Sequence, residues 1–263
     1  MRRLIAFPCA GETLVGTLDK APGTTGLLIV SGGNEIRCGA HRGMAMLAAR
    51  LAEAGHPVLR FDRRGIGDST GTNRGFESSA EDIAAAVALL RAEAGVARVV
   101  AFGNCDAATA LILFHAGLGI DALLLANPWL VEPQGDLPPA PAIRSHYAAR
   151  LRDPAQWLRL LRGGVDLNKL GKGLQSILAS HSVDAGDLAT RAAASLEATE
   201  APVKILLAQG DNTAIAFLDI WSSSAFNVAR SRVSIEKRDT ASHSFAREGD
   251  KQWLFEQVLA ALS

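Results

Sequence analysis

The sequence predicts an α/β fold, in which helices cover both faces of a mostly parallel central sheet. Short apolar runs, typical of strands buried on both faces, occur at residues 26–30, 98–102, 122–125 and 203–208. Segments with helical spacing alternate with them, at residues 42–54 and 79–94 among others. Such alternation is typical of parallel strands joined by helical crossovers. The length of 263 residues favours a single core.

Further elements complete this alternation. Residues 4–7 and 13–18 read as a first hairpin, with its turn at residues 8–12. Two more strands are expected at residues 57–61 and 233–236, and further helices after residue 105 and at 214–226 and 251–262.

The alternation stops after Asn127-Pro128-Trp129 and resumes only near residue 199. A proline-rich loop and several helical patterns lie in between. We therefore predict a helical lid at residues 127–198, inserted into a core formed by residues 1–126 and 199–263. A longer crossover and a separate domain are the alternatives.

Composition narrows the classes of partner. The chain has 27 basic and 27 acidic residues, so its balanced charge does not favour nucleic acid or an anionic membrane as a partner. No apolar run is long enough for a membrane span, and the N-terminal run is too short for a signal peptide. The three cysteines lack metal-ligand spacing and their odd number suits a reducing compartment. We expect a cytoplasmic protein that needs no metal or cofactor.

A candidate nucleophile lies where an apolar strand pattern stops. Residues 98–102 are followed by Gly103, Cys105 and Ala107, and then by an apolar helical pattern. Small residues two positions either side of Cys105 are typical of a nucleophile elbow, the sharp strand–turn–helix that presents its central side chain. The helix N-terminus favours a thiolate there. The alternative is a buried structural cysteine.

A general base and an acid follow later strands. Asp211 comes directly after residues 203–208, and His243 follows residues 233–236. The order nucleophile, acid, histidine is that of one group of hydrolases. We therefore expect His243 to move the proton of Cys105, and Asp211 to orient the imidazole of His243. His41 is the rival base, and Asn127 offers a Cys-His-Asn alternative.

Acyl transfer also requires donors for the oxyanion. We expect the backbone N–H of Asp106 and that of Gly33 or Asn34, because a glycine pair follows the strand at residues 26–30. The charged residues after this loop would bind an anionic group of the substrate, or form a solvated surface. Expected substrate contacts lie after this loop and in the insertion: Arg37, His41, Arg42, Asn127, Trp129 and Tyr147.

These motifs carry a family resemblance. Residues 62–69 match the D-x-R-G-x-G-x-S segment of the α/β-hydrolase superfamily, and residues 103–107 match its elbow. More closely, the chain resembles the type 1 hydrolase associated with the exosortase A system. The residues that carry this closer resemblance are Gly32, Gly33, Arg37, Gly39, His41, Arg42, Cys105 to Ala108, Asn127 to Trp129 and His243 to Phe245.

The resemblance implies an α/β-hydrolase fold and a cytoplasmic enzyme from bacteria that make exopolysaccharide. With the residues above, we expect hydrolysis of an ester or thioester through an acyl-enzyme on Cys105. An acyltransferase that passes the acyl group to a sugar or amine, and a non-catalytic binding protein, are the alternatives. The expected partner is a small-molecule acyl substrate, and a homodimer is left open.

Overall fold

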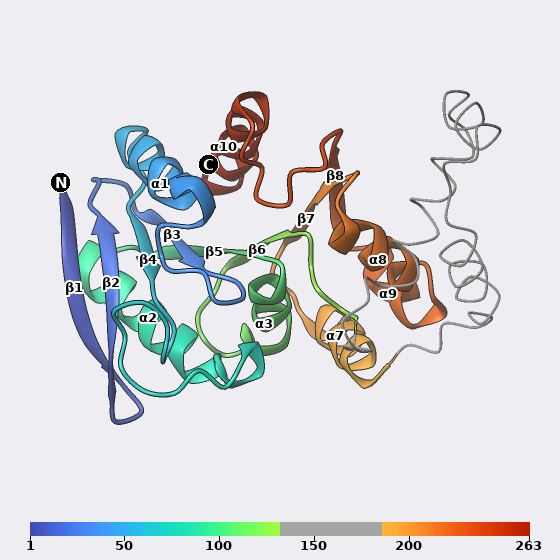
Figure 1. Cartoon of the computed structure of the whole chain (residues 1–263), viewed down its shortest axis with the longest axis horizontal. Helices are drawn as coiled ribbons and strands as arrows, with labels where there is room; N and C mark the ends of the chain where they lie inside the picture. The colour runs from blue at the N-terminus through green and yellow to red at the C-terminus, as the bar shows by residue number, and fades with distance from the viewer. Residues whose placement is uncertain (132–185) are drawn as a thin grey trace, which may run out of the picture.

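The computed structural model describes residues 1–131 and 186–263 (Figure 1). One eight-stranded sheet runs in the order β1-β2-β4-β3-β5-β6-β7-β8. Its strands are β1 (Arg2–Cys9), β2 (Glu12–Asp19), β3 (Thr25–Val30), β4 (Val58–Phe61), β5 (Arg98–Asn104), β6 (Ala122–Ala126), β7 (Val203–Ala208) and β8 (Ser234–Arg238). The helices described are α1 (Gly43–Glu53), α2 (Ala80–Ala94), α3 (Asp106–Phe114), α7 (Asp187–Ala198), α8 (Asn212–Trp221), α9 (Asn227–Arg230) and α10 (Glu248–Leu262).

The sheet is mostly parallel, as the sequence predicts. Strand β2 pairs antiparallel with both β1 and β4. Parallel pairing joins all neighbouring strands in the rest of the sheet, in the order β4-β3-β5-β6-β7-β8. Parallel strands end at one edge of the sheet, so the loops that follow β3, β5, β6, β7 and β8 meet there. Every candidate site residue of the described chain comes from one of these loops or from an adjoining helix start.

Helices cover both faces of the sheet, which confirms the predicted layering. In Figure 1, α1 and α10 lie on one side, and α2, α3 and α7 lie on the other. Two apolar clusters correspond to these faces, one including Leu47, Leu51 and Val258, the other Ile83, Leu111 and residues of α7 and α8. Buried apolar side chains on both faces explain why the central strands read as uninterrupted apolar runs.

The first hairpin differs from its prediction at the turn. Both strands are longer than expected, and Pro8 pairs with Thr13 inside the ladder rather than starting the turn. The turn consists of Ala10 and Gly11, which have φ angles of 49° and 82°. A tight hairpin turn with positive φ suits strand twist, and Pro8 is tolerated because β1 is an edge strand.

The end of the predicted insertion belongs to the core. Helix α7 contacts α3, and its Ala189, Ala192 and Leu196 are buried in the same apolar cluster as α2 and α3. The boundary expected at residue 198 therefore falls after a core helix that leads into β7. Residues 132–185, which hold most of the predicted lid, lie outside the described residues.

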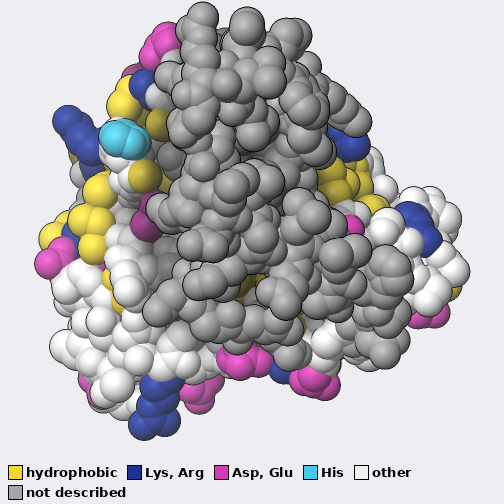
Figure 2. Space-filling view, turned by 45° about the vertical axis from the view of Figure 1, so that its right-hand side comes forward, with side chains coloured by type: hydrophobic (Ala, Val, Ile, Leu, Met, Phe, Trp, Pro, Cys, Tyr) yellow, Lys and Arg dark blue, Asp and Glu magenta, His cyan; other side chains and the backbone are white. Residues whose placement is uncertain are grey.

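The surface agrees with the balanced composition. Lysine and arginine side chains stand singly among acidic and apolar ones on the described part of the face in Figure 2. Within the described residues, no helix is both long and apolar enough to cross a membrane.

Candidate active site

Cys105 occupies a sharp turn between β5 and α3. Its φ of 61° and ψ of −126° are strained for a residue with a side chain. A Cβ on Gly103 would lie 2.7 Å from the carbonyl carbon of Ala107, so this close approach requires glycine. The N–H of Cys105 donates to Ala126 at the end of β6, 2.9 Å away. This geometry is that of a nucleophile elbow, with the thiol half-exposed at the sheet edge.

The structure brings His243 and Asp211 together beside this thiol. Nδ1 of His243 lies 2.9 Å from Oδ2 of Asp211, and the imidazole also interacts with the Cys105 side chain. Asp211 ends the loop after β7 and caps α8 by accepting from the N–H groups of Thr213 and Ala214. A helix cap fixes the carboxylate, so the imidazole is oriented by a group that cannot turn freely.

The electrostatics of this pair favour a charged imidazole. The hydrogen bond to Asp211, followed by that to Cys105, raises the pKa of His243 to about 10, against the opposing effect of burial. The arrangement can therefore keep a proton on His243 that is available to a leaving group.

The expected oxyanion donors lie beside a carboxylate. The N–H of Gly33, after β3, donates to Oδ1 of Asp106 at 2.6 Å. Arg63 donates to the carbonyl of the same glycine at 2.6 Å, and its Nη2 lies 3.8 Å from Oδ2 of Asp106. The backbone N–H of Asp106 itself opens α3 and has no acceptor within the helix ladder. One predicted donor is thus engaged by a side chain, and the other faces outward from the helix start.

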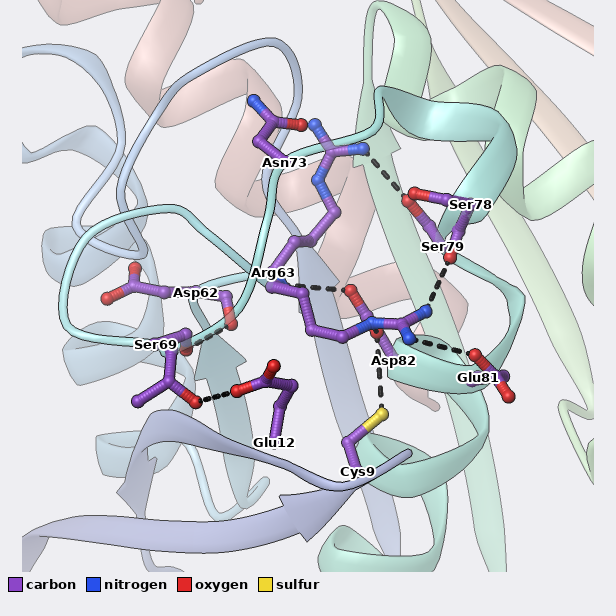
Figure 3. Close-up of polar contacts among 12 residues, drawn as sticks. Cys9, Glu12, Asp62, Arg63, Ser69, Asn73, Ser78, Ser79, Glu81 and Asp82 are labelled. Atoms are coloured by element: carbon purple, nitrogen blue, oxygen red, sulfur yellow. Dashed lines mark hydrogen bonds and ion pairs between the residues drawn. The ribbon is translucent and has the colours of Figure 1, made fainter.

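Arg63 is a buried cation beside this loop. Its Nη1 donates to Ser79 at 2.9 Å, and its exposed fraction is 3%. Burial lowers its pKa, whereas the Asp106 carboxylate opposes that effect. Figure 3 shows the Arg63 side chain extending toward Asn73, which donates to Asn34 at 2.8 Å. Charged and amide groups therefore hold both Gly33 and Asn34.

Asn127 and Asn104 lie on the histidine side of the thiol. Asn127 is fully buried at the end of β6 and donates to the backbone carbonyl of His243 at 2.9 Å. It therefore contacts the histidine through its main chain, and no bond to the imidazole is found for it among the described contacts.

The other residues predicted to contact the substrate differ in their exposure and in their ion pairs. The guanidinium of Arg37 pairs with Asp62 and Asp68 and donates to Thr17, so it ties its loop to the sheet. His41 and Arg42 are exposed and have positive φ angles of 52° and 59° at the start of α1.

The residues predicted for the far side of the pocket are only partly described. The backbone of Trp129 bonds to Cys105 and Thr109. Tyr147 lies outside the described residues.

The remaining cysteines differ from Cys105. Cys9 is buried in the cluster of Figure 3, where its thiol lies 3.4 Å from Asp82, and burial followed by this carboxylate raises its pKa to about 11. The Cys38 thiol contacts the carbonyl of Gly39 at 3.6 Å. Neither lies on an elbow with a histidine partner among the contacts of the described chain. No group of His, Cys, Asp and Glu side chains that could hold a metal occurs in residues 1–131 and 186–263.

Comparisons with known proteins identify the family and agree with the fold. The model of the alpha/beta hydrolase family matches residues 27–256. The Pyrococcus furiosus esterase Pf2001 has a similar structure, with a TM-score of 0.65 and 15% identity over 100% of this chain and 90% of that one. The thioesterase domain from the curacin biosynthetic pathway aligns with a TM-score of 0.60 and 12% identity, over 100% and 99% of the two chains.

An alpha/beta hydrolase from Sphaerobacter thermophilus has a TM-score of 0.60 and 19% identity, over 98% of this chain and 100% of that one. At these identities the likeness concerns the fold. No curated protein sequence matched the chain.

Two residues around the thiol escaped the sequence-based assignment. Asn104 directly precedes Cys105 and donates to the backbone carbonyl of His243. Arg63 lies in the segment 62–69 and donates to the backbone carbonyl of Gly33. Their only sequence signal is their position within a motif. The partners of both lie far along the chain, so their roles become visible only when the strand ends meet.

Proposed function

Since this chain belongs to the alpha/beta hydrolase family, we propose that it hydrolyses an ester or thioester with Cys105 as the nucleophile. The observation that carries the proposal is one thiol on a strained elbow next to an imidazole that Asp211 holds at 2.9 Å. A non-catalytic role would not require that alignment. The closer relation to exosortase-associated hydrolases and a cytoplasmic location form part of the same proposal.

The proposed reaction has two steps, acylation of Cys105 and hydrolysis of the resulting thioester. His243 takes the thiol proton of Cys105 and the sulfur attacks the carbonyl carbon; the bond to the leaving oxygen or sulfur then breaks as His243 gives that proton to the leaving group. The product is a thioester on Cys105. Water then attacks that carbonyl while His243 takes a proton from the water, and the C–S bond breaks as His243 passes this proton to the sulfur, which releases the acid and restores the thiol. Asp211 orients the imidazole in both steps.

The oxyanion of each tetrahedral intermediate requires N–H donors. The N–H of Asp106 is available at the start of α3, where the helix dipole also favours negative charge. The second donor is the N–H of Gly33 or Asn34. For Gly33, the carboxylate of Asp106 has to leave its present hydrogen bond first.

Mass spectrometry of the intact protein tests the proposal. Brief mixing with an activated acyl ester or an acyl thioester is expected to add the mass of the acyl group, and peptide mapping is expected to place it on Cys105. The Cys105→Ser variant is expected to lose most turnover, because a hydroxyl is a far weaker acid than a thiol. Cys9 and Cys38 serve as internal controls. Acylation elsewhere, or none, would rule the proposal out, and an acylated amine or sugar would identify a transferase.

A further inference from the structure

Two asparagines converge on one backbone carbonyl. Nδ2 of Asn127 lies 2.9 Å from the carbonyl oxygen of His243, and Nδ2 of Asn104 lies 3.3 Å from the same oxygen. The two amides are also linked, because Asn127 Nδ2 donates to Oδ1 of Asn104 at 3.2 Å. A carbonyl oxygen can accept two hydrogen bonds, so a single atom of His243 is held by both.

Both polar atoms of the Asn127 side chain are hydrogen-bonded within the protein. Its two amide hydrogens go to His243 and Asn104, and its Oδ1 accepts from the N–H of Ala208 at 2.9 Å. Its own N–H donates to Leu206, and its φ of 41° is unusual for a residue with a side chain. Strain and complete burial at one residue indicate that its side chain has to be in this place.

The position of Asn104 links the histidine to the thiol. Asn104 is the last residue of β5, and Cys105 follows it directly. His243 lies in the irregular segment between β8 and α10, which has no ladder of its own to fix it. The hydrogen bond from Asn104 to the His243 carbonyl therefore links the end of β5, which carries the thiol, directly to the segment that carries the histidine.

We infer that Asn127 and Asn104 are positioning residues that hold the His243 carbonyl and thereby set the imidazole between Asp211 and Cys105. The inference rests on the proposed function, in which these groups react. Neither asparagine bonds to the imidazole, so both act through the backbone. A displacement of about 1 Å in a reacting group can cost about 10²-fold in rate, which gives this anchor its importance.

The segment has other attachments that do not reach the imidazole. Thr240 donates to Asp250 at 2.6 Å, and Arg238 donates to the same carboxylate at 2.9 Å. Ser242 accepts from the N–H of Ala246 at 2.8 Å. Loss of an asparagine is therefore expected to leave the segment folded while its histidine shifts, which separates positioning from stability.

The test uses Asn104→Ala, Asn127→Ala and the double variant in the full chain. Asn104 is half-buried, so Asn104→Ala remains informative where the fully buried Asn127→Ala folds poorly. Asn227→Ala, an exposed asparagine of α9, is the matched control. For each folded variant, kcat and KM are measured with one activated ester. The rate of Cys105 alkylation by iodoacetamide is measured near neutral pH and at high pH, together with Tm.

We expect kcat to fall by about 10- to 100-fold with KM within about twofold, because the misplaced group acts in the reaction and not in binding. Alkylation slows near neutral pH, where it depends on His243, and stays unchanged at high pH, where hydroxide removes the thiol proton. The double variant is expected to lose less than the product of the single effects, because both side chains hold one atom.

A lower Tm with unchanged kcat in both single variants would overturn the inference and leave the proposed function intact. A wild-type protein that turns over neither esters nor thioesters would instead refute the proposed function. The alkylation rates would then still decide whether the asparagines position His243, since alkylation requires no substrate.

Discussion

On one side of Cys105, His243 is held by Asp211 through its ring and by Asn127 through its backbone. On the other side, the N–H of Gly33 is already bound by the carboxylate of Asp106, and its carbonyl is bound by the buried Arg63. The histidine side is thus arranged for proton transfer as it stands. Under the proposed mechanism, the Gly33 N–H has to release its hydrogen bond to Asp106 before it can receive a substrate oxygen.

Each side contains one carboxylate, and the two differ in what that carboxylate binds: Asp211 binds the imidazole, whereas Asp106 binds an N–H expected to receive the oxyanion. On the histidine side, the negative charge of Asp211 stabilises the imidazolium of His243, and two amide side chains hold its backbone carbonyl. The glycine loop is held by an anion and a cation, whose bonds are strong but respond to any new charge nearby. A developing oxyanion carries such a charge, so the two sides are expected to respond oppositely when a carboxylate is replaced by an amide.

The largest effect is expected from Asp211→Asn. Asparagine also caps helices, so α8 is retained while the negative charge beside His243 is lost. Loss of a triad carboxylate costs about 10⁴ in kcat in a serine protease. We expect about 10² here, because the raised pKa of His243, about 10, means that the imidazole already carries its proton before the reaction.

Steady-state kinetics with an activated ester measure this loss, and Asp211→Ala adds the loss of the cap, about 1 kcal/mol in unfolding free energy. Unchanged turnover in Asp211→Asn together with inactive Asn127→Ala would favour a Cys-His-Asn arrangement instead.

The opposite sign is expected from Asp106→Asn. The neutral amide binds the N–H of Gly33 less strongly than a carboxylate does, and it removes a negative charge beside the oxyanion. We expect an aldehyde that forms a hemithioacetal with Cys105 to bind about tenfold more tightly, a change of about 1.4 kcal/mol. Inhibition constants measure this, with the corresponding alcohol as a control that forms no oxyanion. Weaker aldehyde binding would mean that the carboxylate supports the loop and does not obstruct it.

A pH dependence of stability sharpens the histidine side. Because the folded state raises the pKa of His243 from 6.5 to about 10, its protonated form is favoured by folding. This contribution is complete below pH 6.5 and is lost as the pH rises through about 10. We expect the difference in Tm between the wild type and Asp211→Asn to be largest near pH 6.5 and to shrink as the pH rises toward about 10. Thermal unfolding over that range measures it, and a constant difference would contradict the raised pKa.

The smallest effect on activity is expected from Arg37→Ala. Its guanidinium pairs with Asp62, whose side chain is fully buried, so the change leaves a buried charge without its partner. We expect a loss of about 3 kcal/mol in unfolding free energy, with KM within about twofold in the folded enzyme. Arg3→Ala removes an exposed pair with Glu93 and is expected to change neither. A raised KM without loss of stability would assign Arg37 to the substrate.

Much of the fold could be read from local patterns. Apolar runs identified the central strands because those strands are buried on both faces, and glycine and alanine around Cys105 identified the turn. The predicted hairpin turn at residues 8–12 is wrong at Pro8: proline is typical of turns, but pairing at a sheet edge allows Pro8 to remain in the strand. Helix α7 falls within the predicted insertion because its apolar face consists mostly of alanines and becomes a core face only against α3.

The sequence by itself determined which side chains follow the strand ends, and parallel pairing then brings Cys105, Asp211 and His243 to one edge of the sheet. Only the tertiary structure decided how their neighbours are used. Asp106 binds Gly33 across 73 residues of chain, and Asn127 binds the His243 carbonyl across 116. A periodic pattern records which face of an element is buried. It does not record which polar atoms meet between elements, because such contacts depend on packing that the whole chain sets together.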